Sequence, residues 1–117
     1  MEKVTPVSTE QALKLCAKSV RYDAVAIRQL LEAKQAEAFL IGDCCFITRF
    51  EHYENEKELI VMCAEGQGLL QAGRTLKILA KQHNCTSARM HTHRKGMQRL
   101  AAEFGWKQLE VVYTMSL

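Results

Sequence analysis

The sequence has few of the residues that break up a chain. Pro6 is the only proline among 117 residues, and no repeat, low-complexity tract or linker divides the sequence. A chain of this length has enough material for one hydrophobic core and too little for two. We therefore expect a single domain that spans residues 1–117.

Long hydrophobic runs and strong charge are also absent. No apolar stretch approaches the roughly 20 residues needed to cross a bilayer, and the start, Met-Glu-Lys-Val-Thr-Pro, lacks the apolar core of a secretory signal. The formal net charge is +3, with acidic residues mixed among the basic ones, whereas nucleic-acid-binding proteins cluster lysine and arginine with aromatics. We expect a cytoplasmic protein with neither a membrane partner nor a nucleic-acid partner.

The five cysteines are odd in number and form no Cys-x-x-Cys pair. Most of them lie within apolar stretches, which predicts small buried side chains in a reducing compartment. Cys44 and Cys45 are adjacent and would point to opposite faces of a strand, which argues against a shared metal ion. We expect no metal site.

The first half of the chain begins with a short strand and two helices. Val4 to Val7 can form the strand, and Ser8 then offers a helix N-cap with Gln11 three residues later. A second helix is expected to begin near Asp23. Ala38 to Ile41 is a short apolar strand.

A tight-turn signal, Gly42-Asp43, separates that strand from the next, Cys44 to Phe50. The polar segment His52 to Lys57 predicts a loop. The strand after it, Glu58 to Ala64, has apolar residues on both faces, which is typical of a central strand covered on both sides. Strict alternation would place Leu59, Val61 and Cys63 on one face and Ile60, Met62 and Ala64 on the other.

The helical period returns at Leu69 and stops at Asn84. Thr86 to His93 is expected to be extended, Lys95 to Phe104 helical, and Lys107 to Leu117 a final strand. A meander of strands that leads into a strand–helix–strand crossover predicts an α/β (α+β) fold, with a mixed sheet and helices on both faces.

This order of elements, with a strand running into Glu65-Gly66-Gln67-Gly68-Leu69-Leu70 and Gly105-Trp106 after a later helix, resembles the GNAT family of acetyl-CoA-dependent N-acetyltransferases. The resemblance implies a mostly antiparallel sheet of about six strands and acetyl-CoA as cofactor. Backbone amides at a glycine-flanked helix N-terminus can hold a pyrophosphate. The residues that the resemblance assigns to the cofactor are Met62, Cys63, Ala64, Gly66, Gln67, Gly68, Leu69 and His93.

Several positions depart from the family pattern. Glu65 stands where the family often has arginine, and Leu70 where it has a small residue. Ala101 replaces a tyrosine that serves as general acid, and His93 replaces an asparagine. These departures predict a degenerate coenzyme A site and a non-catalytic binding or structural role with protein partners, in an oligomer or a larger assembly. Small proteins of this kind occur in tailed phages, so a place inside a virion is the alternative to the cytoplasm.

The alternative function is a working N-acetyltransferase that acts on an amine. Its candidate bases are His91, His93 and Glu58, and Tyr113 is a candidate acid in a rearranged site. His91 and His93 would share one face of a strand, but no third ligand is placed to complete a metal site. Tyr113 also fits a half-buried core position.

A basic stretch near the end of the Thr86 to His93 segment could meet a phosphate of coenzyme A or an acidic partner, or simply be a solvated helix face. It consists of Arg89, Arg94, Lys95 and Arg99. Glu54, Glu56 and Glu58 could likewise recruit an amine or form a solvated loop.

Overall fold

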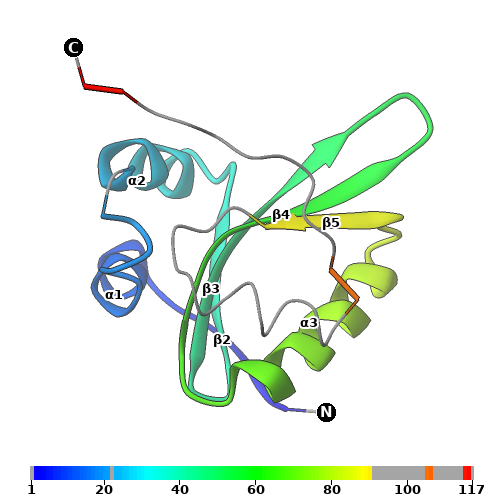
Figure 1. The fold of residues 1–117 in the computed structure, drawn as a ribbon, viewed down its shortest axis with the longest axis horizontal. Coiled ribbons are helices and arrows are strands. Elements are labelled where there is room, and N and C mark those ends of the chain that lie inside the picture. The colour runs from blue at the N-terminus through cyan, green and yellow to red at the C-terminus, as the bar shows by residue number, and fades with distance from the viewer. Residues whose placement is uncertain (1, 22, 91–104, 107–114, 117) are drawn as a thin grey trace.

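The computed structural model describes residues 2–21, 23–90, 105–106 and 115–116. Along the chain its elements are β1 (Val4–Pro6), α1 (Thr9–Leu15), α2 (Ala24–Glu32), β2 (Glu37–Ile41), β3 (Cys44–His52), β4 (Lys57–Gly66), α3 (Leu69–Gln82) and β5 (Ser87–Met90) (Figure 1). None of the described helices is both long and apolar enough to cross a membrane.

Five described strands form one sheet in the order β1-β2-β3-β4-β5. The first four pair in antiparallel fashion, and β5 pairs parallel to β4 after the α3 crossover. The expectation of a mixed, mostly antiparallel sheet is confirmed. The predicted helix 95–104 and most of the predicted final strand 107–117 lie outside the described residues.

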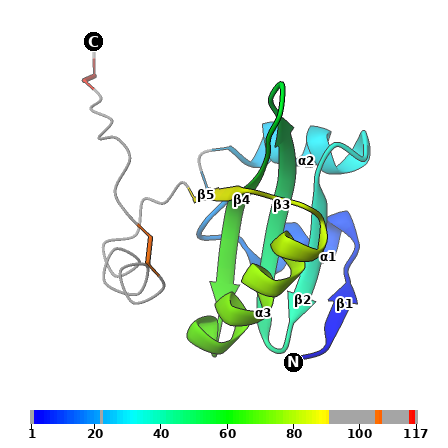
Figure 2. The same ribbon diagram turned by 90° about the vertical axis from the view of Figure 1, so that its right-hand side faces the viewer.

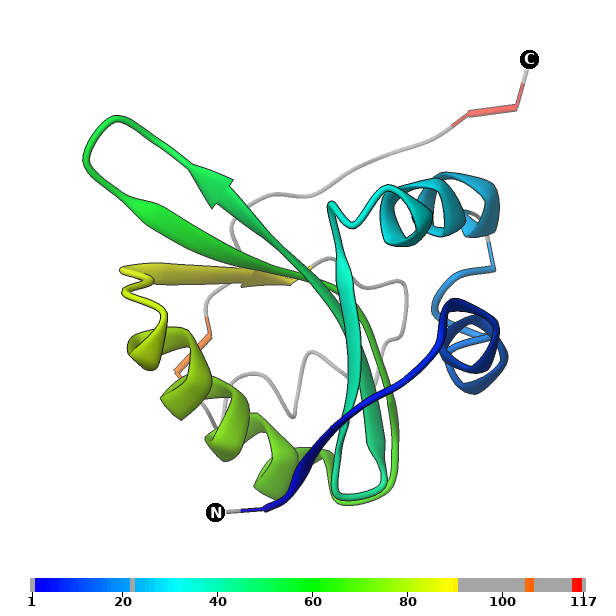
Figure 3. The ribbon, with the colours of Figure 1, turned by 180° about the vertical axis from the view of Figure 1, so that it is seen from behind.

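Helices cover both faces of this sheet, as the sequence predicts. Figures 2 and 3 show α1 and α2 on one side, which we call the α1–α2 face, and α3 on the other, the α3 face. The buried residues of the α1–α2 face are Ala12, Cys16, Val20, Ile27, Leu31, Ala36, Cys45, Ile47 and Cys63. Those of the α3 face are Ile41, Cys44, Phe46, Leu59, Val61, Ala64, Ala72 and Leu76. Cys44 and Cys45 therefore lie on opposite faces, as expected from their adjacency.

The predicted start of the first helix is also confirmed. The Ser8 hydroxyl accepts a hydrogen bond from the Gln11 amide at 3.2 Å. This contact satisfies one of the amides that a helix leaves free at its N-terminus.

A β-bulge in β4 corrects the expected alternation. Ile47 pairs with Cys63, but the next pair joins Thr48 to Val61, so Met62 has no partner on β3. An extra residue in one strand shifts every later side chain to the opposite face. Ala64 consequently packs on the α3 face and Cys63 on the α1–α2 face, the reverse of their predicted placement.

Candidate functional site

The connection from β4 to α3 is built on two glycines with left-handed or otherwise positive φ. Gly66 has φ 135° at the end of β4, and Gly68 has φ 73° as the N-cap of α3. A Cβ on Gly66 would lie 2.2 Å from the carbonyl oxygen of Asp43, so the β2–β3 turn leaves no room for a side chain there. A Cβ on Gly68 would meet no atom of the described residues within 4 Å, which leaves the backbone of this residue open to approach.

The N-terminus of α3 has hydrogen-bond donors that no described side chain caps, and the first turn of α3 contains no acidic residue. The carboxylates of Glu2 and Asp43 lie near Cys44 on the neighbouring turn. The first amides of a helix have no partner within the helix, and the helix dipole adds partial positive charge there. This end of α3 is therefore suited to an anion.

The carboxylate of Glu65 does not disturb this arrangement. One of its oxygens accepts a hydrogen bond from the Ser19 amide, in the segment that joins α1 to α2. After the bulge at Met62, residue 65 faces the α1–α2 side of the sheet, so its side chain leaves the loop. The Glu65 side chain is therefore turned away from the connection to which the resemblance assigns the cofactor.

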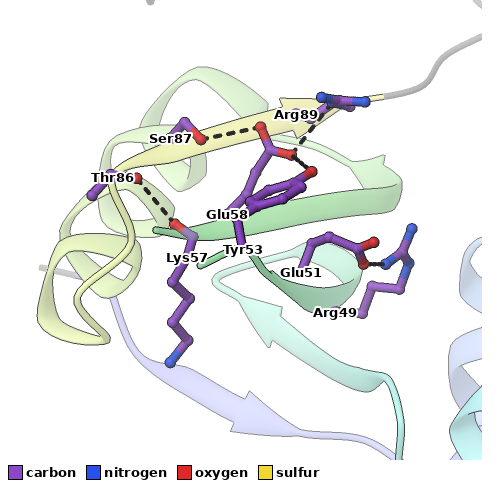
Figure 4. Close-up of polar contacts among 8 residues, drawn as sticks. All are labelled: Arg49, Glu51, Tyr53, Lys57, Glu58, Thr86, Ser87 and Arg89. Atoms are coloured by element: carbon purple, nitrogen blue, oxygen red, sulfur yellow. Dashed lines mark hydrogen bonds and ion pairs between the residues drawn. The ribbon is translucent and has the colours of Figure 1, made fainter. Parts of the chain in front are cut away.

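A second polar cluster surrounds Glu58, near the start of β4 (Figure 4). Glu58 accepts hydrogen bonds from the Tyr53 hydroxyl at 3.2 Å and from the Ser87 hydroxyl at 3.1 Å. The Nε of Arg89 lies 3.5 Å from the same carboxylate. The Glu58 side chain is only 10% exposed, so two hydroxyl donors and the charge of Arg89 compensate a carboxylate largely removed from water.

The local fold brings these donors together from distant parts of the chain. Parallel pairing of β4 with β5 sets Ser87 beside Glu58, and the turn after β3 brings Tyr53 back over the start of β4. Leu59 packs on the α3 face, so Glu58 and its partners lie on the opposite face. Arg89, considered from the sequence as a phosphate ligand, is engaged here instead.

An open cavity of about 500 Å³ lies on the α3 face, next to the β4–α3 connection. Its lining is largely apolar, and Lys77 and Lys81 of α3 add positive charge to it. Val61, Ala64 and Leu69 line it from β4 and the start of α3. The cavity thus follows β4 toward the N-terminus of α3.

The structure places the remaining predicted site residues as follows. Gly66, Gln67, Gly68 and Leu69 form the β4–α3 connection, Met62 is the bulged residue and Ala64 lines the cavity, whereas Cys63 is buried on the other face. His91, His93, Tyr113 and Ala101 lie outside the described residues. Glu54 and Glu56 lie in the turn between β3 and β4. Among the described residues, no group of three or more metal-ligating side chains occurs.

Two functional candidates were missed from the sequence. Ser87 gives no local signal, because its role depends on the β4–β5 register. Cys44 was interpreted only as a core residue, yet its thiol donates to the carbonyl of Gln67 at 3.0 Å. Burial raises the pKa of this thiol to about 11, so it keeps its donor proton at neutral pH.

No protein-family model matches this sequence, and no curated protein sequence matches it. Solved structures do. A probable acetyltransferase superposes with a TM-score of 0.66 at 11% identity, covering 98% of this chain and 97% of that one. The aminoglycoside 6'-N-acetyltransferase of Acinetobacter haemolyticus gives 0.64 at 17% identity, covering 98% and 97%.

The ribosomal-protein-alanine N-acetyltransferase of Brucella melitensis biovar Abortus 2308 gives a TM-score of 0.65 at 14% identity, covering 98% of this chain and 99% of that one. The chain therefore has the GNAT fold, as its resemblance implied. At these identities the likeness concerns the fold.

Proposed function

We propose that this protein binds acetyl-CoA at the β4–α3 connection and transfers the acetyl group to a primary amine. The observation that carries the proposal is the N-terminus of α3, which follows Gly66 and Gly68, is capped by no described side chain and has no acidic residue in its first turn. The hydrogen bond from the Ser19 amide holds Glu65, which stands where the family often has arginine, on the α1–α2 face. Amine acceptance also fits the names of the structural neighbours, since aminoglycosides and alanine share an amino group.

The residues present fit the cofactor. The backbone amides that follow Gly68 would hold its pyrophosphate, and the open space at Gly68 permits close approach. Lys77 and Lys81 of α3 add positive charge on the adjoining cavity. When bound, acetyl-CoA supplies an acetyl group activated as a thioester.

Glu58 is the residue we assign to proton transfer. An ammonium group must lose a proton before its nitrogen can attack a carbonyl carbon, and a carboxylate oxygen of Glu58 would take that proton. Tyr53, Ser87 and Arg89 hold this carboxylate in one orientation. β4 connects the two parts of the site. Glu58 lies eight residues before Gly66, at most about 26 Å along an extended strand, and on the opposite face of the sheet from the cavity. In this proposal the amine approaches from the α1–α2 face and the cofactor from the α3 face.

The second candidate function is a non-catalytic binding role in an oligomer or a larger assembly such as a virion, and the surroundings of Glu58 support the non-catalytic part of it. The carboxylate of Glu58 already accepts two hydrogen bonds, forms an ion pair with Arg89 and is mostly buried. A carboxylate engaged in this way can serve as one half of a structural ion pair as readily as it can serve as a catalytic base. In that case the site would bind a partner or retain the cofactor without turnover.

Calorimetric titration with acetyl-CoA tests the proposal. We expect binding by the wild-type protein and a loss of at least tenfold in affinity for Gly68→Glu, because a carboxylate would face the pyrophosphate. Gly68→Gln is the matched control, since it has nearly the same size and the same backbone cost without the charge. Absence of heat at high micromolar acetyl-CoA would refute cofactor binding.

Release of coenzyme A thiol in the presence of a panel of amines separates the two candidates. The acetyltransferase proposal expects turnover that Glu58→Gln reduces by about a hundredfold, with acetyl-CoA affinity preserved. Binding without turnover of any amine would instead favour the non-catalytic role.

A further inference from the structure

The Cys44 side chain has a contact that core packing does not require. It begins β3 directly after the β2–β3 turn, is fully buried, and lies among the apolar residues of the α3 face. Its Sγ nevertheless lies 3.0 Å from the carbonyl oxygen of Gln67, close for a hydrogen bond donated by sulfur. The thiol therefore binds the middle residue of the β4–α3 connection.

The planarity of the peptide bond makes this contact consequential. In a trans peptide the C=O and N–H bonds point in nearly opposite directions, and no cis peptide occurs among the described residues. Because the carbonyl of Gln67 points toward Cys44, the amide N–H of Gly68 points away from it. Among the described residues, no atom lies within 4 Å of the position that a Cβ of Gly68 would take, so the backbone of Gly68 is open to a ligand.

The β2–β3 turn and the start of β3 also fix Gly66, the residue before Gln67. Cys44 pairs with Gly66 across the β3–β4 ladder, and the carbonyl oxygen of Asp43 and the Cα of Cys44 fill the space beside Gly66. Two successive residues of the connection, Gly66 and Gln67, are thus held by Asp43 and Cys44. The hydrogen bond to Cys44 fixes the orientation of the Gln67–Gly68 peptide, which could otherwise rotate next to Gly68.

We propose that Cys44 is a positioning residue, whose thiol orients the Gln67–Gly68 peptide so that the Gly68 amide is presented to an anion at the N-terminus of α3. The inference rests on the proposed function in one respect, that the anion is the pyrophosphate of acetyl-CoA. A merely structural Cys44 would fill volume in the core, and its hydrogen bond would not affect ligand binding.

Three variants separate these roles. Cys44→Ser keeps a donor and nearly the same volume, whereas Cys44→Ala removes the donor. Cys45→Ala is the matched control, because it removes a thiol of equal size and burial one residue away, on the opposite face of the sheet.

The first measurement uses the ligand-free protein. The ¹⁵N shift of Gly68 in an NMR spectrum reports hydrogen bonding at the preceding carbonyl. We expect it to move in Cys44→Ala and to stay close to the wild-type position in Cys44→Ser and Cys45→Ala. An unmoved Gly68 signal in a folded Cys44→Ala protein would overturn the proposal.

The second measurement is the affinity for acetyl-CoA, with inorganic pyrophosphate as the minimal probe. Loss of one hydrogen bond that orients a ligand-binding group is expected to weaken binding about threefold to tenfold in Cys44→Ala. Cys44→Ser should remain within about twofold of wild type, and Cys45→Ala should match wild type at a comparable loss of stability. Equal affinity of Cys44→Ala and Cys45→Ala, or equal weakening of Cys44→Ser and Cys44→Ala, would overturn the positioning role. If the wild-type protein binds neither probe, the proposed function fails, and the Gly68 signal alone still decides whether the thiol orients the peptide.

Discussion

Replacing each glycine of the β4–α3 connection by alanine should have sharply different consequences. At Gly66 the new Cβ would lie 2.2 Å from the Asp43 carbonyl oxygen and 2.8 Å from the Cys44 Cα. Both atoms belong to the backbone, one in the β2–β3 turn and one at the start of β3, so neither can rotate away as the end of a side chain could. At Gly68 the new Cβ has open space, and only the positive φ opposes it.

The expected magnitudes follow from these two situations. A φ of 135° is a region almost confined to glycine and costs a side chain about 1–3 kcal/mol. The overlap at Gly66 adds roughly 1–3 kcal/mol more, so Gly66→Ala should destabilise the fold by about 4 kcal/mol. Gly68→Ala has only the left-handed conformation to accommodate, at about 1 kcal/mol.

Urea denaturation followed by circular dichroism measures both values, and a thermal melt checks them. For a domain of this size each kcal/mol corresponds to about 4 °C in Tm. Gly66→Ala should therefore melt about 15 °C below wild type and Gly68→Ala about 4 °C below. If Gly66→Ala were no less stable than Gly68→Ala, the close packing of the β2–β3 turn against the connection would be refuted.

Three further predictions test other parts of the structure by urea denaturation. Ser8→Ala should lower the free energy of unfolding by about 1 kcal/mol, because the first helix loses its N-cap; an unchanged value would contradict the cap. Glu65→Ala should cost about 1–2 kcal/mol, because the Ser19 amide loses its acceptor, and Glu65→Gln should recover most of this loss; equal losses would contradict the contact. Burial raises the pKa of Cys44 to about 11 and of Cys63 to about 12, from an ordinary value of 9.0. The unfolded chain therefore releases these protons at a lower pH than the folded protein does. The free energy of unfolding should be highest below about pH 9 and should fall as the pH rises through the folded-state pKa values. A urea midpoint unchanged between about pH 8 and about pH 10 would contradict this, and replacement of both cysteines by alanine should flatten the decline.

Much of the fold could be predicted because it depends on local patterns. The cap at Ser8, the turn at Gly42 and the strand–glycine–helix unit from β4 to α3 are each set by neighbouring residues. The change from a period of two to a period of 3.6 residues locates the start of α3 to the residue.

The faces of β4 could not be predicted, because a bulge carries no clear signal in a continuous apolar run. Alternation holds from Leu59 to Val61 and is then shifted by the unpaired Met62. That shift alone sends the side chain of Glu65 toward Ser19 rather than toward the connection. The interpretation of this residue therefore depended on strand register, which pairing with β3 decides.

Part of the candidate site could likewise be predicted from local sequence, and part could not. The sequence by itself determined the GNAT-like order of elements and the two glycines before α3, because glycine is the residue that tolerates positive φ and close backbone approach. Only the tertiary structure decided which groups meet: Ser87 and Arg89 with Glu58 across parallel strands, and the Cys44 thiol at the start of β3 with the Gln67 carbonyl in the β4–α3 connection. These contacts join residues more than twenty positions apart, and their partners are fixed by sheet register and burial, which no local pattern encodes.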